Sequence, residues 1–358
     1  MITGITFIDN RKLKCNNGKT KQEEFEIMNF SGFFDKVSSE FNRLGAMDAS
    51  VHSWVVAYSG GVDSRVLLHV AAKLKPEHVK KIKVVHVNHG ISDFDLDWEE
   101  SAKEVCSRYE VDLSIERVTL AKGASEEKMA RDARYSAISK YVEQGSFVFM
   151  GHHLNDNIET FMFRLFRGTG LNGLRCIPEK RSFACGFIVR PFLSLDRKSI
   201  EEFALSSGLE WVTDESNIDT KYSRNFIRHK ILPVVLERYS DALNVINRTI
   251  KQFKEAQSLL DEIAECDMKS VAADKKITKG DGVCLDLSKL KELSKPRAKN
   301  VIIKFFSLHS DLNQESKRLD NLMNIVYGEN KNNSKLKKIE YSGFVILTNG
   351  RVIWCEKR

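Results

Sequence analysis

The stretch VVAYSGGVDSRVLLH, residues 55–69, constrains the fold of this chain more than any other feature. An apolar strand runs directly into two adjacent glycines, and an apolar helix pattern follows at 64–75. Parallel α/β sheets are built from such strand–turn–helix units, and they bind ligands just beyond the carboxyl ends of their strands. The stretch therefore predicts an α/β domain that carries a ligand site at this turn.

The chain repeats this alternation up to about residue 170. Apolar strand patterns lie at 53–58, 81–90, 111–118 and 146–153, and amphipathic helix patterns lie at 64–75, 98–110, 125–144 and 155–167. Strands that alternate with helices in this way predict a parallel sheet with helices on both of its faces.

A second domain is expected after this sheet, because 358 residues exceed the usual size of a single core. Long helical patterns cover 224–239 and 242–268, and FVILTNGRVIWC at 344–355 predicts a hairpin around its Asn-Gly pair. We therefore predict an α/β domain over 31–239 and a smaller, mainly helical α+β domain over 240–358. Residues 1–30 form a polar, aperiodic N-terminal extension, compatible with a disordered arm, and Met28 opens the first predicted helix.

The net charge of +7 is concentrated in the second domain. Residues 240–358 hold 22 Lys or Arg against 16 Asp or Glu, a net +6, whereas residues 1–239 carry only +1. A basic surplus favours a polyanionic partner such as RNA. The seven cysteines form no Cys-x-x-Cys pair and no apolar run reaches membrane length, so we expect a cytoplasmic protein without a structural zinc, an iron–sulfur cluster or a membrane segment.

The hexapeptide Ser59-Gly60-Gly61-Val62-Asp63-Ser64 meets the requirements of a backbone phosphate site. Glycines let the main chain approach an anion, and the first N–H groups of the following helix lack intrahelical partners and carry partial positive charge. Ser59 and Ser64 add hydroxyl donors. Asp63 would repel a bare phosphate, so its presence predicts a Mg²⁺ ion between this carboxylate and a pyrophosphate group. The Walker pattern is excluded, because no Gly-Lys-Ser/Thr follows.

SGGVDS resembles the pyrophosphate loop of the N-type ATP pyrophosphatases, the PP-loop superfamily, which cleave ATP to AMP and pyrophosphate. Five further segments occur in the order seen in tRNA(Ile)-lysidine synthetases: HVNHGIS (86–92), ARDARY (130–135), GHHLNDNIETFMFRLFRGTGLNGL (151–174), RPFL (190–193) and DESNIDTKYSRNFIR (214–228). This resemblance implies an adenine-nucleotide α-hydrolase-like domain. It also implies a ligase that uses ATP to join free L-lysine to carbon 2 of the wobble cytidine of tRNA(Ile), with the basic domain binding the tRNA.

The resemblance also implies roles for individual residues. Asp63 would hold the metal, Arg131 and His152 would contact the nucleotide, and Asp156 would orient the lysine ammonium and help to remove its proton. The family motif has two adjacent acids where this chain has Asn155 and Asp156, which favours Asp156 as the working carboxylate.

The residues by themselves leave alternatives open. Asp156 could simply cap the helix, and Arg131 could belong to a solvated basic face with Arg134. The alternation of strand side chains sends His152 and His153 in opposite directions, so one is expected to pack in the core while the other faces the ligand. Arg228, together with Arg224, either reaches a substrate or begins a basic helix.

Two further patterns bear on the type of function. GTGLNG, 168–173, matches a dinucleotide fingerprint but follows a helix rather than a strand, which excludes NAD binding and predicts a loop that closes over substrates. His86 and His89 end a strand without further ligands at metal-binding spacing. Competing hypotheses are a tRNA thiolase, a small-molecule ligase of the GMP or NAD synthetase type, and a non-catalytic nucleotide-binding module. The sequence leaves a homodimer open.

Overall fold

The computed structural model describes residues 21–90, 94–118, 126–213, 221, 223–273, 284–308, 316–327, 337–341 and 344–357. Contacts divide the chain into two compact units, Met1–Ile250 and Lys251–Arg358. The division falls inside helix α10 (Ala242–Ser270), slightly beyond the predicted boundary at 239/240.

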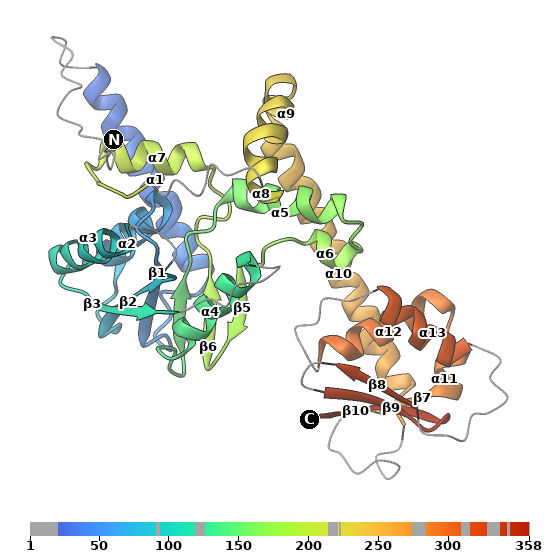
Figure 1. The fold of residues 1–358 in the computed structure, drawn as a ribbon. Coiled ribbons are helices and arrows are strands. Elements are labelled where there is room, and N and C mark those ends of the chain that lie inside the picture. The colour runs from blue at the N-terminus through green and yellow to red at the C-terminus, as the bar shows by residue number, and fades with distance from the viewer. Residues whose placement is uncertain are drawn as a thin grey trace. The chain divides into compact units, whose positions relative to one another are not determined.

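The first unit is an α/β structure in which strands and helices alternate along the chain (Figure 1). Its strands are β1 (Ser53–Tyr58), β2 (Lys81–Asn88), β3 (Asp112–Arg117), β4 (Ser146–Phe149), β5 (Lys180–Phe183) and β6 (Gly186–Val189). Its helices before α10 are α1 (Lys21–Arg43), α2 (Val62–Leu74), α3 (Asp95–Arg108), α4 (Glu126–Ser139), α5 (Leu154–Phe166), α6 (Leu171–Leu174), α7 (Arg197–Ser206), α8 (Ser223–Phe226) and α9 (Leu232–Arg238).

The six strands form one sheet in the order β3-β2-β1-β4-β6-β5. Five neighbouring strands are parallel, as predicted, and only β5 runs antiparallel, as the outer strand of a hairpin with β6. Because β1 and β4 are parallel neighbours, the turns that lead into α2 and α5 lie at the same edge of the sheet. The order of the strands therefore brings SGGVDS and the His-His segment together.

Both faces of the sheet are covered, as predicted. Along β1, Trp54 and Val56 pack on one side against apolar residues of α1, α2, α3 and α7. The intervening Val55 packs on the other side, in a buried cluster that includes Ile138 of α4. This alternation is the period-2 geometry of a strand that is buried on both faces.

Two predicted element boundaries differ from the structure. Helix α1 begins at Lys21, so residues 21–30 are helical rather than an aperiodic arm, and the helix expected from Met28 begins earlier; residues 1–20 lie outside the described residues. The helix predicted over 224–239 is interrupted by a π-helical turn at Ile227–Ile231 between α8 and α9. A π turn widens one turn of a helix and often occurs at a functional site.

The second unit contains a four-stranded antiparallel sheet and three short helices beside the end of α10. Its elements are β7 (Leu285–Asp286), α11 (Leu287–Glu292), α12 (Lys295–Ser307), α13 (Ser316–Tyr327), β8 (Lys337–Tyr341), β9 (Phe344–Thr348) and β10 (Val352–Lys357). The predicted hairpin is confirmed as β9 and β10. Phe305 and Phe306 are buried in the core, so these two aromatic residues are structural.

Candidate active site

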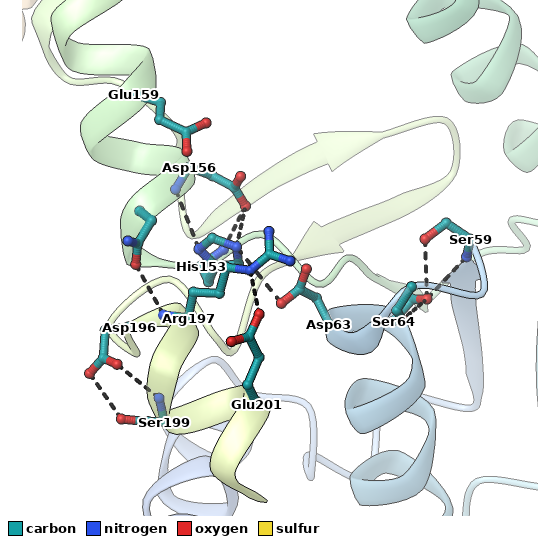
Figure 2. Close-up of polar contacts among 12 residues, drawn as sticks. Ser59, Asp63, Ser64, His153, Asp156, Glu159, Asp196, Arg197, Ser199 and Glu201 are labelled. Atoms are coloured by element: carbon teal, nitrogen blue, oxygen red, sulfur yellow. Dashed lines mark hydrogen bonds and ion pairs between the residues drawn. The ribbon is translucent and has the colours of Figure 1, made fainter. Parts of the chain in front are cut away.

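The loop between β1 and α2 is held in shape by its own serines (Figure 2). Gly60 has φ +87°, a left-handed conformation that glycine adopts without strain. The hydroxyl of Ser64 accepts the N–H of Ser59 at 3.1 Å and donates to the carbonyl of Gly61 at 3.0 Å. Ser64 is buried and Ser59 is exposed. The structure therefore places Ser64 in the support of the loop, and Ser59 at its open side.

The first turn of α2 is left open to a ligand. Its N-cap residue, Gly61, has an extended backbone with φ −68° and ψ 163°, and no side chain among the described residues caps the helix. The N–H groups that open a helix have no partner within it. The amides that follow Gly61, including those of Val62 and Asp63, are thus available to an anion such as phosphate.

Two close contacts fix the position of this loop. The N–H of Val212 donates to the carbonyl of Gly60 at 3.0 Å. On the other side, Gly151 follows β4 so closely that a Cβ atom there would lie 3.1 Å from the carbonyl carbon of Asp63 and 3.2 Å from its Cβ. Only glycine allows this approach without a shift of the backbone, so the end of β4 packs directly on the start of α2.

Helix α5 begins with a reciprocal cap made by His153 and Asp156. The backbone N–H of His153 donates to Asp156 Oδ2 at 3.0 Å, and the N–H of Asp156 donates to His153 Nδ1 at 3.4 Å. The capping role considered for Asp156 is therefore confirmed. His153 is the histidine that packs, with 1% of its surface exposed, while His152 is half-buried.

His153 also connects the two acids of the site (Figure 2). Its Nε2 lies 3.7 Å from Asp63 Oδ1 and 3.5 Å from Asp156 Oδ2. Because Nδ1 accepts a hydrogen bond, Nε2 carries the proton of the neutral ring and faces both carboxylates. The structure thus brings Asp63 and Asp156, from two different helices, to one imidazole.

The surroundings of Asp63 and Asp156 shift the pKa values of the two carboxyl groups in opposite directions. Burial raises the pKa of Asp63, and the charges of His153 and Arg197 only partly oppose this effect. Burial also acts on Asp156, but there His153, His152 and Arg228 outweigh it and hold the pKa below its ordinary value. Asp156 is consequently kept ionised, whereas the charge on Asp63 is disfavoured until a cation approaches.

A third acid, Glu159, joins the site from the next turn of α5. Arg228 on the π-helical turn donates from Nε to Glu159 Oε1 at 2.6 Å and from Nη2 to Glu159 Oε2 at 2.8 Å. The same Nη2 lies 3.3 Å from Asp156 Oδ1. Burial raises the pKa of Glu159, and Arg228 opposes this shift. The guanidinium of Arg228 thus contacts both acids of α5, and the substrate contact considered for it stays a prediction.

His152 is held by Arg190, the arginine of RPFL. Arg190 is buried and donates from Nε to His152 Nδ1 at 3.2 Å and from Nη1 to the carbonyl of Pro178 at 2.7 Å. Burial, with the nearby charge of Arg190, lowers the pKa of His152 to about 3. His152 is therefore neutral at physiological pH, and its Nε2 carries a proton that can be donated to a ligand.

The remaining predicted residues occupy separate places. Arg131 and Arg134 are both exposed on α4, and the Arg131 guanidinium lies 5.5 Å from the ring centroid of Tyr135. His86 is buried, with Nδ1 3.1 Å from the carbonyl of Tyr58. The GTGLNG segment follows α5 and contains the short α6, so it does not follow a strand.

The two asparagines of the His-His segment act as hydrogen-bond acceptors for neighbouring backbone. Asn155 Oδ1 accepts the N–H of Arg197 at 3.0 Å, and the buried Asn157 accepts the N–H of Ile177 at 3.0 Å. Both contacts tie α5 to adjoining segments. Asn155 and Asn157 thus hold α5 in position, and the carboxylates near the start of this helix are those of Asp156 and Glu159.

Asp63 is suited to share a cation with a ligand rather than to bind one by protein groups alone. Its Oδ1 is buried and has no hydrogen-bond partner among the described residues. Within that part of the chain, no three His, Cys, Asp or Glu side chains are arranged to hold a metal ion. A Mg²⁺ ion at Asp63 would therefore take most of its remaining ligands from phosphate oxygens and water, as Mg²⁺ usually does in nucleotide sites.

Three contributors to this site were not predicted from the sequence. Glu159 lies three residues after Asp156, a spacing that puts both on one face of a helix, and this was the available signal. The contact of Arg190 with His152 and that of Arg228 with Glu159 span 38 and 69 residues of sequence, and no local pattern indicates either of them.

An α/β sheet with an uncapped glycine turn after one of its central strands places this chain among α/β proteins with an anion site at a strand–helix turn. The PP-loop domain model matches residues 34–235, so the chain belongs to that family. Within the part of the chain that the structure describes, no helix is both long and apolar enough to cross a lipid bilayer.

Curated relatives carry a more specific name. A tRNA(Ile)-lysidine synthase from Coxiella burnetii is 34% identical over 276 residues, covering 76% of this chain and 60% of the relative. One from Vibrio atlanticus is 45% identical over 214 residues, covering 59% of this chain and 47% of the relative. The chain thus spans about half to three-fifths of the length of these relatives. A solved U34-tRNA thiolase from Methanococcus maripaludis shares the fold, with a TM-score of 0.51 at 16% identity over 68% of this chain and 87% of that chain.

Proposed function

We propose that this chain is a tRNA(Ile)-lysidine synthetase: it joins free L-lysine to carbon 2 of the wobble cytidine in a tRNA(Ile) with a CAU anticodon and converts ATP to AMP and pyrophosphate. Family membership and the names of the relatives support the reaction class. The observation that carries the proposal is the meeting, at His153, of the open start of α2 with the acidic start of α5.

The proposed reaction has two steps. The C2 oxygen of cytidine attacks the α-phosphorus of ATP, and the bond to pyrophosphate breaks. The ε-amine of lysine then attacks C2, the C2–O bond breaks, and AMP leaves with that oxygen while the amine loses a proton. The first step needs an ATP whose triphosphate is held in line, and the second needs a lysine amine placed beside C2.

The start of α2 is suited to the triphosphate. Its uncapped amides can donate to the pyrophosphate moiety, and Ser59 can add a hydroxyl. Asp63 would hold Mg²⁺, which would neutralise charge on the phosphates. The neutral His152 can donate from Nε2 to the nucleotide.

The start of α5 is suited to the lysine. Asp156 is kept ionised, so it can attract an ammonium group, and the buried Glu159 adds a second carboxylate on the same helix face. The lowered pKa of Asp156 supports its role in orienting lysine and weighs against its role as a proton acceptor, because an acid with a low pKa is a weak base.

The basic residues of 240–358 would bind the tRNA. We expect the reaction to take place in the cytoplasm, since this tRNA modification requires ATP and free lysine. Phosphate contacts by Lys and Arg make such binding strongly dependent on salt. This proposal for the second unit rests on its charge, since its buried aromatic residues serve its own core.

The test is lysine transfer by the purified full chain. Labelled lysine, ATP and a tRNA(Ile) transcript with a CAU anticodon should give labelled RNA and AMP in equal amounts, and a transcript with a different wobble base is the control. Formation of AMP without RNA, with no lysine in the transcript, would instead favour a small-molecule ligase and contradict the proposal.

A further inference from the structure

Three arginines from different elements surround Tyr135 on α4. The guanidinium of Arg131, on the same helix, lies 5.5 Å from the ring centroid, and that of Arg181, on β5, lies 5.0 Å from it. Arg190 Nη2 lies 3.5 Å from the phenolic oxygen. Burial alone would raise the pKa of Tyr135, but the three arginines together hold it below its ordinary value. The phenol therefore lies in a strongly positive potential.

No carboxylate offsets this charge among the described residues. The hydrogen bonds of Arg181 and Arg190 go to neutral groups, namely the carbonyls of Ser182 and Pro178, His152 and Tyr135. Glu179, two residues before Arg181, is paired instead with Arg43 at 2.9 Å. The arginines around Tyr135 are thus a group of positive charges without an acidic partner in this part of the chain.

These charges repel one another. Burial, together with Arg181 and Arg131, lowers the pKa of Arg190. Burial, together with Arg131, Arg224 and Arg175, lowers the pKa of Arg164 on α5. An anion that bound among these guanidinium groups would relieve the repulsion, which is the electrostatic signature of an anion site.

The arginines divide into two kinds. Arg164 and Arg190 each tie two segments together, since Arg164 Nη1 donates to the carbonyl of Gly173 at 2.7 Å and Arg190 Nη1 donates to that of Pro178 at 2.7 Å. The carbonyl contact of Arg181 is to its chain neighbour Ser182, at 3.3 Å. Arg131 is exposed and Arg181 is half-buried, and both lie against the Tyr135 ring, where a cation–π contact orients them. The first pair builds the framework, and the second pair presents its guanidinium groups to a ligand.

We propose that Arg181, together with Arg131, binds a phosphodiester group of the RNA substrate. Guanidinium groups match the geometry of phosphate oxygens and are the preferred partners of phosphate in proteins. This inference rests on the proposed function, and it places an RNA contact in the first unit, outside the basic region 240–358.

The position of the pair favours RNA over the triphosphate of ATP. Helix α4 packs on the face of the sheet opposite to α2, and β5 is an edge strand of the sheet. The positive charge also continues from Arg131 to Arg164, Arg175 and Arg224, over more elements than one nucleotide needs. A polynucleotide backbone presents a series of phosphates that such a surface can follow.

The experiment compares the wild-type full chain with Arg181→Ala and Arg181→Lys. We expect Arg181→Ala to weaken binding of a tRNA(Ile) transcript about tenfold at fixed salt and to reduce the salt slope by about one, with unchanged ATP affinity. Arg181→Lys keeps the charge, so its salt slope should stay at the wild-type value. The matched control is Arg108→Ala on α3, which removes an exposed arginine from the other face of the sheet and should leave RNA binding unchanged.

Each alternative result has a distinct meaning. An unchanged salt slope for Arg181→Ala in a folded protein, as judged by circular dichroism, overturns the inference. A loss of ATP affinity equal to the loss of RNA affinity overturns it as well, because the phosphate would then belong to the nucleotide. If the wild-type chain binds RNA with the expected slope difference but transfers no lysine, the proposed function fails and the RNA contact stands. A wild-type chain that binds no RNA contradicts both.

Discussion

Helices α2 and α5 begin at the same edge of the sheet, yet their first turns are completed in opposite ways. Helix α2 starts at a glycine and has no side-chain cap, whereas α5 starts with a reciprocal cap between His153 and Asp156. An open first turn leaves amides for an anionic ligand, and a capped one uses them internally. The difference supports the proposal that the backbone of α2 and the side chains of α5 recognise substrate groups of opposite charge.

The largest expected effect follows from removal of the acid at the open helix start. Asp63→Asn should reduce AMP formation by about a thousandfold or more, because the carboxylate proposed to hold Mg²⁺ is lost while the shape is kept. Burial disfavours the charge of Asp63 in the folded state, so the melting temperature should not fall. Steady-state AMP release and thermal melting check both statements, and wild-type turnover in this variant would refute the metal role.

Asp156 at the capped start should show separable effects on function and stability. Asp156→Asn retains a cap acceptor but not the charge, so the KM for lysine should rise about tenfold to a hundredfold. Asp156→Ala also loses the cap and should lower the free energy of unfolding by about a further 1 kcal/mol. Lysine titrations and denaturant unfolding measure the two effects.

The pH dependence of the Asp156→Asn variant provides a control. Since the folded-state pKa of Asp156 is lowered, its charge stabilises the fold above its unfolded-state pKa, and this stabilisation is lost as pH falls through the folded-state pKa. The stability difference between wild type and Asp156→Asn should therefore disappear in acid. A difference that stays constant as the pH falls from 7 through the acid range would show that packing, not charge, is responsible.

A side-chain cap introduced at the start of α2 should make this helix start resemble the capped start of α5. Gly61→Ser supplies an N-cap side chain, so the KM for ATP should rise about tenfold while the free energy of unfolding increases by a few tenths of a kcal/mol. A Cβ at Gly61 meets only Ser59 Oγ at 3.6 Å, an ordinary contact, so the loop tolerates it. Gly61→Ala is the matched control and should leave the KM for ATP nearly unchanged; an equal rise in both variants would indicate a steric effect.

The prediction for His152, directly before the cap of α5, concerns the stability of the fold. Its pKa of about 3 in the fold lies below the ordinary 6.5, so the unfolded chain takes up this proton first as pH falls. The free energy of unfolding should then decrease by up to about 1.4 kcal/mol per pH unit below 6.5 from this group, and His152→Gln should lack that contribution. His69 on α2, with a pKa of about 4, supplies a slope of the same sign that should remain in the variant. Identical slopes in both proteins, measured by denaturant unfolding between pH 4 and 7, would contradict this.

Local features of this protein were predictable, and long-range side-chain pairing was not. Sequence patterns within about ten to twenty residues predict the glycine turn, the alternation of strands and helices, and the parallel sheet. The Asn-Gly hairpin follows from a local pattern of the same kind. Which of His152 and His153 packs could not be decided, because strand alternation gives opposite directions without assigning them. The meeting of Arg228 with Asp156 and Glu159 depends on a π-helical turn, and a regular helix pattern does not reveal such a turn.

The close approach of Gly151 to Asp63 limits how the enzyme can be altered. A methyl group at residue 151 would force the segment that follows β4 and the first turn of α2 apart by a few tenths of an ångström. The span between the uncapped amides of α2 and the carboxylates of α5 is therefore fixed by the lack of a single carbon atom. Redesign for a longer or shorter amine has to leave this glycine in place and adjust the reach of the side chains at residues 156 and 159 instead.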